Sequence, residues 1–321
     1  MTARTQWKEA VTAVEQAASI LVVTHVSPDG DAIGSLLGLA VALRERGKKV
    51  AAAVDGGVPE FLKFLPGAKT VRDKLKQGRW DVMVSVDASD EERTGACGAF
   101  GRARSRLVIN LDHHLTNTGF GDIFLVMPEA VSATEIVYRW LVEMQHPISQ
   151  PVATALLAGL VTDTMGFRTQ NVTAETFSIV QALMAAGAPL AEVTARALVA
   201  KPYSSIELWK RVLPSVRLDD GIISAWITQD DLAAAGIKDV TDGGLVSLLA
   251  SVEDAKIAVV FKQKPDGAVE ISLRSKPGFD IGQVALELGG GGHAQASGAT
   301  IPGPLEAAAA RVMPLLAGVV R

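Results

Sequence analysis

The chain has 321 residues, of which 48% are hydrophobic, so it is long enough for about two domains with sizeable cores. Its formal net charge of −4 argues against a protein that binds long nucleic acid mainly by neutralising phosphates, although a local basic patch stays open. Cys97 is the only cysteine, which excludes an intrachain disulfide, and no apolar run approaches the roughly 20 residues of a membrane span. Glu9 and Glu15 interrupt any pattern of a signal peptide. We therefore expect a soluble protein of the cytoplasm, without a membrane partner.

Predicted helices and strands alternate along the first half of the chain. Apolar residues at helical spacing indicate helices over residues 7–18, 31–46, 151–161 and 173–186, and Ser132 with Glu135 forms a capping box that opens another helix. Short apolar runs indicate strands over residues 20–23, 49–55, 80–88 and 106–114. The connection over residues 59–67 carries Phe61, Leu62 and Phe64, which we expect in the core. This alternation predicts an α/β fold with a mostly parallel, doubly wound sheet.

Ionisable side chains follow several of these strands. His25 follows the first strand, Asp87 ends the third, and Asp112, His113 and His114 end the fourth. In doubly wound sheets, ligands bind beyond the carboxyl ends of the strands. One strand that ends in Asp is ordinary, because Asp starts turns. Three strands from separate parts of the chain that all end in metal-type ligands favour a metal site at this edge of the sheet.

The stretch over residues 19–34 carries the densest group of such side chains. Asp29 and Asp31 stand two residues apart in the turn between strand and helix, close to His25. Carboxylates at a few ångströms raise each other's pKa, and a hard divalent cation removes that conflict. The alternative is an ordinary turn in which Asp29 and Asp31 serve as turn and N-cap residues. The stretch alone leaves both interpretations open.

The pattern changes after a helical connector over residues 187–213. Strands are predicted over residues 221–228, 256–263 and 268–275, and helices over residues 245–251, 279–288 and 305–319. We therefore expect a second, smaller α/β domain. Four glycines at residues 289–292 precede His293, and they suit either a flexible linker or a backbone cradle for an anion.

Five motifs, taken in order, resemble those of the DHH phosphoesterase superfamily. They are HVSPDGDAIGS at residues 25–35, Asp87 followed by Arg93 and Gly95, LDHH at 111–114, TDT at 162–164 with Phe167 and Arg168, and GGGH at 290–293 followed by Ala296, Ser297 and Gly298. The specific resemblance is to the small two-domain branch of bacterial oligoribonucleases (nanoRNases) and 3′-phosphoadenosine-5′-phosphate phosphatases, and it covers nearly the whole chain. Met165 stands where this family more often has a small residue, and Thr169 where an aromatic is common. Both departures bear on the fit of the substrate.

The resemblance implies a DHH catalytic domain over residues 1–187, a linker over 188–213 and a smaller substrate-binding domain over 214–321, with the active site in the cleft between the domains. It implies two divalent cations, with Asp87 as their bridge. The ligands would be His25, Asp29, Asp31, Asp87, His113 and Asp163. Mixed carboxylate and imidazole ligands suit Mn²⁺, with Mg²⁺ or Co²⁺ as substitutes.

Further residues acquire roles from the same resemblance. Asp112 is expected to orient a histidine, and His114 to face the substrate phosphate as a proton donor or charge stabiliser, with a purely structural histidine as the alternative. Arg168 is a candidate for substrate binding, with a surface salt bridge as the alternative. The implied contacts to a substrate phosphate in the second domain are Arg274, Gly290, Gly291, Gly292 and His293.

The expected activity is the Mn²⁺-dependent hydrolysis of short RNA to mononucleotides and of 3′-phosphoadenosine-5′-phosphate to AMP. The expected partners are short oligoribonucleotides, small phosphorylated nucleotides and a second copy of the chain, without long DNA. A phosphodiesterase for linear or cyclic dinucleotides, such as diadenylate or cyclic di-AMP, shares the catalytic parts and stays open. A polyphosphatase of the same superfamily usually carries a different second domain. A silent nucleotide-binding regulator is expected to have lost ligands, whereas all of them are present here.

Overall fold

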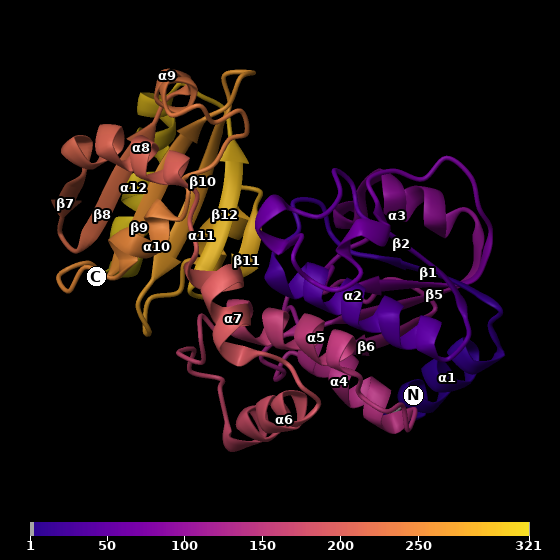
Figure 1. The fold of residues 1–321 in the computed structure, drawn as a ribbon. Helices are drawn as coiled ribbons and strands as arrows, with labels where there is room; N and C mark the ends of the chain where they lie inside the picture. The colour runs from indigo at the N-terminus through magenta and orange to yellow at the C-terminus, as the bar shows by residue number, and fades with distance from the viewer. Residues whose placement is uncertain (1–2, 321) are drawn as a thin grey trace. The chain divides into compact units, whose positions relative to one another are not determined.

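A computed structural model describes residues 3–320 and divides them into two compact units. The first unit ends at Ala200 and the second begins at Lys201 (Figure 1). The boundary falls inside the predicted helical connector, which contains the helices α7 (Leu190–Thr194) and α8 (Tyr203–Val212).

A parallel sheet of six strands organises the first unit. Its strands are β1 (Ser19–Val23), β2 (Lys49–Ala53), β3 (Val71–Arg72), β4 (Trp80–Val86), β5 (Ser105–Asp112) and β6 (Ile123–Val126). They lie in the order β3-β2-β1-β4-β5-β6, and each neighbouring pair is parallel. The chain builds outward from β1 on one side and from β4 on the other, so the switch point lies between these two strands. The predicted doubly wound fold is confirmed.

Helices cover both faces of this sheet. One face carries α1 (Ala3–Gln16), α2 (Gly30–Glu45), α4 (Ala133–Glu143) and α5 (Gln150–Asp163), whereas α3 (Gly95–Arg102) covers the other. Successive side chains of β1 point to opposite faces of the sheet. Ile20 and Val22 pack with the first group of helices, while Leu21 and Val23 pack with Cys97 of α3. A further helix, α6 (Ala174–Ala185), packs against α5.

Small residues bring α2 and α5 into backbone contact. A Cβ atom added to Gly34 of α2 would lie 2.6 Å from the carbonyl oxygen of Ala155 in α5. A Cβ atom added to Gly159 of α5 would lie 2.6 Å from Oδ1 of Asp31. This close approach places the carboxyl end of α5 beside the amino end of α2, where Asp31 lies.

The second unit is built on a mixed sheet. Its strands are β7 (Arg217–Asp219), β8 (Ile222–Ile227), β9 (Ile257–Gln263), β10 (Val269–Ser275), β11 (Gly291–His293) and β12 (Ala296–Ile301), in the order β11-β12-β10-β9-β8-β7. Only the pair β8 and β9 is parallel among these described strands. The helices α8, α9 (Gln229–Ala234) and α10 (Leu245–Ala250) pack on one face, and α11 (Gly282–Glu287) and α12 (Leu305–Val320) pack on the other.

Several sequence-based expectations need correction. Phe61 is 48% exposed, because the single turn Glu60–Leu62 buries Leu62 instead. The capping box at α4 is only half formed, since Ser132 Oγ accepts from Glu135 N but Glu135 Oε2 accepts from Val131 N. The glycine run is not a loop throughout, because residues 291–293 form β11. No clear sequence pattern predicted the short elements β3, β6, β7, α3 and α9.

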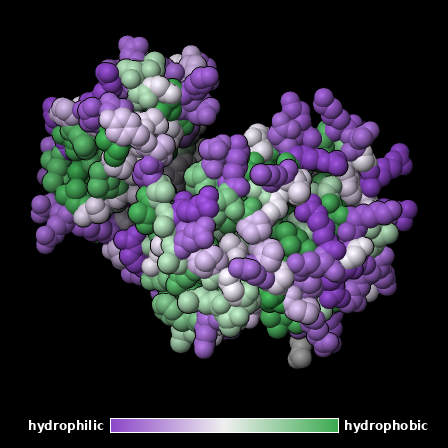
Figure 2. Space-filling model, in the orientation of Figure 1, coloured by the Kyte–Doolittle hydropathy of each residue, from purple (hydrophilic) through white to green (hydrophobic). Residues whose placement is uncertain are grey.

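The outer surface of the two units is mixed in polarity. Figure 2 shows apolar residues gathered over α6, where Phe177 is 53% and Met184 is 47% exposed. Within residues 3–320 no single helix is long and apolar enough to span a membrane. The helical stretches Ala174–Ala185 and Leu190–Ser215 pass that test only as a pair, which is bent by 112°.

Candidate metal centre

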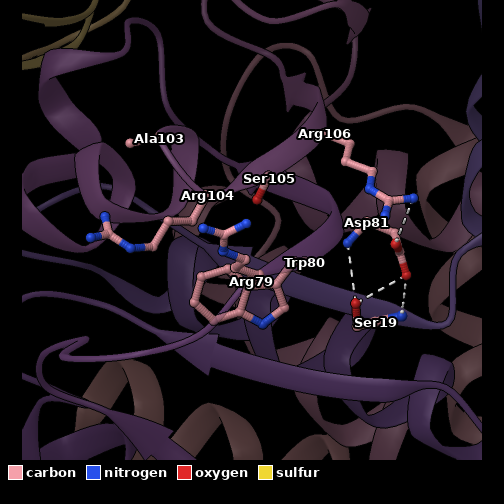
Figure 3. Close-up of a pocket in the computed structure, with 8 residues that line it drawn as sticks. All are labelled: Ser19, Arg79, Trp80, Asp81, Ala103, Arg104, Ser105 and Arg106. Carbon is pink, nitrogen blue, oxygen red and sulfur yellow. Dashed lines mark hydrogen bonds and ion pairs between the residues drawn. The ribbon is translucent and has the colours of Figure 1, made fainter.

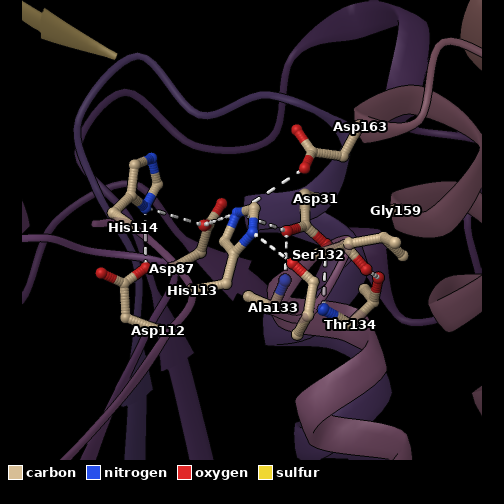
Figure 4. A network of polar contacts seen from close by, with 12 residues as sticks. Asp31, Asp87, Asp112, His113, His114, Ser132, Ala133, Thr134, Gly159 and Asp163 are labelled. Atoms are coloured by element: carbon tan, nitrogen blue, oxygen red, sulfur yellow. Dashed lines mark hydrogen bonds and ion pairs between the residues drawn. The ribbon is translucent and has the colours of Figure 1, made fainter. Parts of the chain in front are cut away.

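Most of the predicted metal ligands meet at the carboxyl ends of β1, β4 and β5. His25 follows β1, Asp87 follows β4 and His113 follows β5, and these strands are neighbours in the parallel sheet. Figure 4 shows His113 in the middle of the group. Its Nε2 lies 3.7 Å from Asp31 Oδ2, 3.7 Å from Asp87 Oδ1 and 3.6 Å from Asp163 Oδ2. His25 approaches from the other side, with Nε2 3.6 Å from Asp87 Oδ2.

Asp87 is the residue that the candidate ligand groups within the first unit share. It belongs to three groups whose ligand atoms lie within 4.8 Å of one another: His25 with Asp29 and Asp87, Asp31 with Asp87 and His113, and Asp87 with Asp112 and His114. Asp87 Oδ1 is buried and accepts no hydrogen bond from the described residues. An unsatisfied buried carboxylate oxygen is costly, and a cation held against it removes that cost. The donor set around Asp87 therefore fits a centre of divalent cations.

The charges in this group shift the pKa of its members in opposite directions. Burial lowers the pKa of His25, but the hydrogen bond and negative charge of Asp87 outweigh it and raise that pKa to about 9. The pKa of His113 is also raised to about 9, because the charges of Asp163, Asp31 and Asp87 outweigh its burial. Burial raises the pKa of Asp31 to about 7, with help from the charge of Asp87. For Asp87, burial opposes ionisation, but the nearby histidines lower its pKa. Because the ligands of a metal have to be deprotonated, cation binding to this group would release protons.

The amino end of α4 fixes the carboxylate of Asp31. Asp31 Oδ2 accepts a hydrogen bond from Ala133 N at 2.6 Å, and Oδ1 accepts one from Thr134 N at 3.0 Å. Gly159 leaves the space that this carboxylate occupies. These contacts were not expected from the sequence, because more than a hundred residues separate the partners and no local pattern marks them.

Asp29 serves as the N-cap of α2, as the alternative interpretation expected. Its Oδ1 accepts hydrogen bonds from Asp31 N and Ala32 N, both at 3.0 Å. The side chain of Asp29 is exposed, and its ligand atom still lies within 4.8 Å of those of His25 and Asp87. Capping and cation binding are compatible here, because the cap uses only one of the two carboxylate oxygens. For Asp31 the N-cap alternative is wrong, since this residue lies within the first turn of the helix.

Asp112 and His114 form a hydrogen-bonded pair at the edge of the group. His114 Nδ1 donates to Asp112 Oδ1 at 2.7 Å, and Asn117 Nδ2 donates to Asp112 Oδ2 at 2.6 Å. Both oxygens of the buried Asp112 carboxylate are therefore engaged, as expected for a residue that orients a histidine. Asn117 also donates to Asn110 Oδ1 at 2.9 Å. The sequence analysis did not predict the contact between Asn117 and Asp112. Its only sequence signal is an amide side chain shortly after the LDHH motif.

The segment after Asp163 is unusual in its backbone. Met165, Gly166 and Phe167 all have left-handed conformations, with φ of 50°, 74° and 64°. Glycine adopts this conformation without cost, which explains why a small residue suits the position of Met165. Arg168 is exposed and its Nε donates to Met165 O at 2.6 Å. It makes no ion pair with the described residues, so the salt-bridge alternative is wrong, and substrate binding by Arg168 stays a prediction.

In the second unit, Arg274 and His293 lie in one row across three strands. Arg274 of β10 pairs with Ala296 of β12, and Ala296 pairs with His293 of β11. Directly paired residues point to the same face of a sheet, so the two side chains flank a single methyl group. A Cβ atom added to Gly292 would lie 2.5 Å from Ala296 O, which shows that this glycine serves the close packing of the hairpin. A role of Gly290, Gly291 and Gly292 toward phosphate stays a prediction.

Fold and site together define an α/β protein with a carboxylate and histidine centre at the switch point of a parallel sheet. Residues 19–160 match the DHH family, N-terminal domain, and residues 229–314 match the DHHA1 domain. The chain therefore belongs to the DHH family.

The chain is similar to several proteins along most of its length. The bifunctional oligoribonuclease and PAP phosphatase NrnA of Thermus thermophilus is 36% identical over 88% of this chain and 84% of that protein. A solved structure of an exopolyphosphatase-related protein from Bacteroides fragilis is 27% identical, with a TM-score of 0.89 and coverage of 98% of this chain and 95% of that one. The cyclic-di-AMP phosphodiesterase GdpP of Geobacillus thermodenitrificans is 25% identical over 87% of this chain and 44% of that protein.

The shared position of Asp87 predicts the behaviour of its alanine variant. Asp87→Ala should bind less than half of the divalent metal of the wild type and lose activity, because all three candidate ligand groups formed within the first unit contain this carboxylate. Elemental analysis of the purified protein and an assay of nucleotide release measure both quantities. Asp254→Ala removes an exposed carboxylate and is the matched control. If Asp87→Ala kept its metal and more than about a tenth of the activity, the bridging role would be wrong.

The hydrogen bonds of Asp112 predict a non-additive pair of substitutions. His114→Ala should lower kcat by roughly 10²–10⁴-fold with unchanged metal content, as for a lost general acid. Asn117→Ala should lower kcat by about 10-fold, because it frees one oxygen of Asp112 and loosens His114. The double variant should be no slower than His114→Ala alone, because Asn117 acts through His114. Losses that multiply in the double variant would show that Asn117 has another role.

Proposed function

We propose that the protein is a divalent-cation-dependent phosphohydrolase that releases mononucleotides from very short RNA and converts 3′-phosphoadenosine-5′-phosphate to AMP. The observation that carries this proposal is the group of carboxylates and imidazoles around Asp87. The Oδ1 atom of Asp87 is buried and accepts no hydrogen bond from the described residues. The substrate class is supported by the similarity over most of the chain to the Thermus thermophilus protein that is named for these two activities.

In this proposal, two divalent cations occupy the centre. Their ligands would be His25, Asp29, Asp31, Asp87, His113 and Asp163. Mn²⁺ is the proposed ion, because imidazole and carboxylate ligands together suit it better than Mg²⁺. Divalent cations in such a centre supply Lewis acidity toward the oxygens of a phosphate.

His114 is proposed to handle the proton of the leaving oxygen. Asp112 accepts the hydrogen bond of His114 Nδ1, which leaves Nε2 as the nitrogen that exchanges a proton. The buried carboxylate of Asp112 fixes the orientation of the ring, and Asn117 holds that carboxylate in place. When the bond from phosphorus to the leaving oxygen breaks, His114 Nε2 donates its proton to that oxygen.

Arg274, His293 and the glycines before His293 are proposed to hold a second phosphate of the substrate. Arg274 and His293 flank Ala296 on one face of the sheet, so a phosphate over this methyl group would find a hydrogen-bonding side chain on each side, one of them the charged guanidinium of Arg274. Arg168 is proposed to contact the substrate near Asp163. We further propose that the protein works in the cytoplasm as a homodimer.

Two alternatives make different predictions about substrates. A phosphodiesterase for cyclic di-AMP is less favoured, because the GdpP relative is less similar and this chain covers under half of it. A polyphosphatase stays worth testing, because the Bacteroides fragilis structure is named exopolyphosphatase-related.

A panel of substrates separates these activities. With Mn²⁺, diadenylate and 3′-phosphoadenosine-5′-phosphate should both yield AMP, while cyclic di-AMP and polyphosphate should react at least about 10-fold more slowly in kcat/KM. Chromatography of the nucleotide products and of released phosphate measures each reaction. A chelator should abolish turnover, and added Mn²⁺ should restore it better than Mg²⁺. Faster release of phosphate from polyphosphate than of AMP from diadenylate would refute the proposed substrate class.

The row of Arg274 and His293 predicts a selective effect on binding. Arg274→Ala and His293→Ala should each raise KM for diadenylate by about 10–100-fold, as for the loss of a charge-assisted contact. Hydrolysis of a small chromogenic phosphodiester should change little, because it carries no second phosphate. Arg217→Ala, in strand β7 at the opposite edge of the same sheet, is the matched control. Unchanged kinetics of both variants on diadenylate would remove the second unit from substrate selection.

A further inference from the structure

The amino ends of the parallel strands carry a second concentration of charge, opposite in sign to the candidate metal centre. A pocket of about 590 Å³ lies at the first residues of β1, β4 and β5, which are Ser19, Trp80 and Ser105. Three arginines, Arg79, Arg104 and Arg106, line it (Figure 3). The metal ligands follow the last residues of the same strands. The seven residues of β4 therefore separate the two sites by roughly 23 Å.

The arginines continue into a longer basic strip. A neighbouring pocket of about 560 Å³ shares Ser19 and Trp80 with the first one and reaches Arg72, and the turn after β3 adds further cations. We define the basic strip by its exposed cations: Arg72, Lys74, Lys76, Arg79, Arg104 and Arg106. Asp73 and Asp81 are the two acidic residues among its lining residues. A chain with a net charge of −4 thus gathers a strongly cationic surface at one edge of its sheet.

The two acids leave most of this positive charge uncompensated. Asp81 Oδ2 accepts hydrogen bonds from Ala18 N, Ser19 N and Ser19 Oγ at 2.9 to 3.0 Å. Asp81 Oδ1 lies 3.6 Å from Arg106, so it offsets only this one arginine. Figure 3 shows Asp81 and Arg106 together beside Ser19, with Arg79 and Arg104 away from them. Neither Arg79 nor Arg104 makes an ion pair with the residues that the structure describes.

The strip is also held in place. The guanidinium of Arg104 stacks on the ring of Phe100 at 3.8 Å, and this ring meets Trp80 edge to face at 6.4 Å. Gly78 lies against Trp80 so closely that a Cβ atom there would stand 2.5 Å from the indole. Trp80 N donates to Arg104 O at 3.0 Å, which keeps Arg79 and Arg104, the residues just before the adjacent strands β4 and β5, near each other. Guanidinium groups that are fixed before binding lose less entropy when they meet an anion.

We propose that the basic strip binds the phosphate backbone of single-stranded RNA that is longer than the oligonucleotides hydrolysed at the metal centre. Phosphates spaced along a chain match a row of guanidinium and ammonium groups, and arginine binds phosphate oxygens in pairs. Trp80 is only 7% exposed, so recognition is by backbone charge and not by stacking on bases. The choice of RNA over another polyanion rests on the proposed function, which makes RNA the polymer that the protein meets.

The test compares two triple variants with the same change in charge. Arg79→Gln/Arg104→Gln/Arg106→Gln removes the centre of the strip. Arg211→Gln/Arg217→Gln/Arg311→Gln removes three exposed arginines of the second unit and is the matched control. Fluorescence anisotropy measures the binding of a phosphorothioate-linked single-stranded RNA of about 16 nucleotides, which keeps its charge and resists hydrolysis. Titrations at several salt concentrations give the slope of log K against log salt.

The expected results follow from the number of phosphate contacts. The strip variant should bind at least about 10-fold more weakly at low salt, and its salt slope should fall by about 2, since each single-strand contact contributes about 0.7. The control variant should bind as the wild type does, and both variants should hydrolyse diadenylate at the wild-type rate. Equal losses in both variants, no binding of RNA by the wild type, or binding of polyphosphate but not RNA would overturn the proposal. Failure of the wild type on diadenylate would instead refute the proposed function and leave the strip to be judged by binding alone.

Discussion

The carboxylate of Asp87 is the constraint on which the rest of the first unit depends. Its backbone has φ 55°, a left-handed conformation that costs a residue other than glycine roughly 1–2 kcal/mol. Asp87 N donates to Leu111 O of the neighbouring strand at 2.8 Å, so the sheet itself holds this conformation. The turn aims a buried carboxylate between His25 and His113, and leaves one oxygen without a hydrogen bond from the described residues. Strain and unsatisfied polarity at one residue are typical of a position built for a ligand.

The side chains around this carboxylate are held in place by further residues. The amino end of α4 fixes Asp31, and Gly159 of α5 leaves room for it. Asn117 fixes Asp112, which in turn fixes His114. Asp31 is therefore held by contacts from another helix, and Asp112 by a side chain of the loop that follows it. Such contacts stop the like-charged carboxylates from turning away from one another, and keep the centre formed before any cation binds.

Sequence patterns predicted the fold and most of the side chains that gather at the strand ends, but not the contacts that hold those side chains in place. Alternating strands and helices predicted the doubly wound sheet, because buried parallel strands are continuous apolar runs. His25, Asp87 and His113 could be placed at one edge, because parallel strands carry their carboxyl ends to the same side. The donors of the hydrogen bonds from Ala133 and Thr134 to Asp31 are backbone N–H groups. Nearly every residue type has such a group, so the sequence does not indicate these bonds. The strand β11 was mistaken for a loop, because glycine has a low strand propensity and only the pairing with β12 stabilises it.

The two ends of the parallel sheet carry opposite charge, and distance lets each act on its own. Asp29, Asp31, Asp87, Asp112 and Asp163 gather at or beside the carboxyl ends, where they repel a phosphate until cations are bound. The basic strip lies at the amino ends, roughly 23 Å away along β4. Screening at physiological salt reduces interactions between exposed charges beyond about 8 Å, so the acidic end does not cancel the attraction at the basic end. The net charge of −4 therefore represents neither the acidic carboxyl end of the sheet nor the basic strip at its amino end. A phosphate is repelled at the first and attracted at the second.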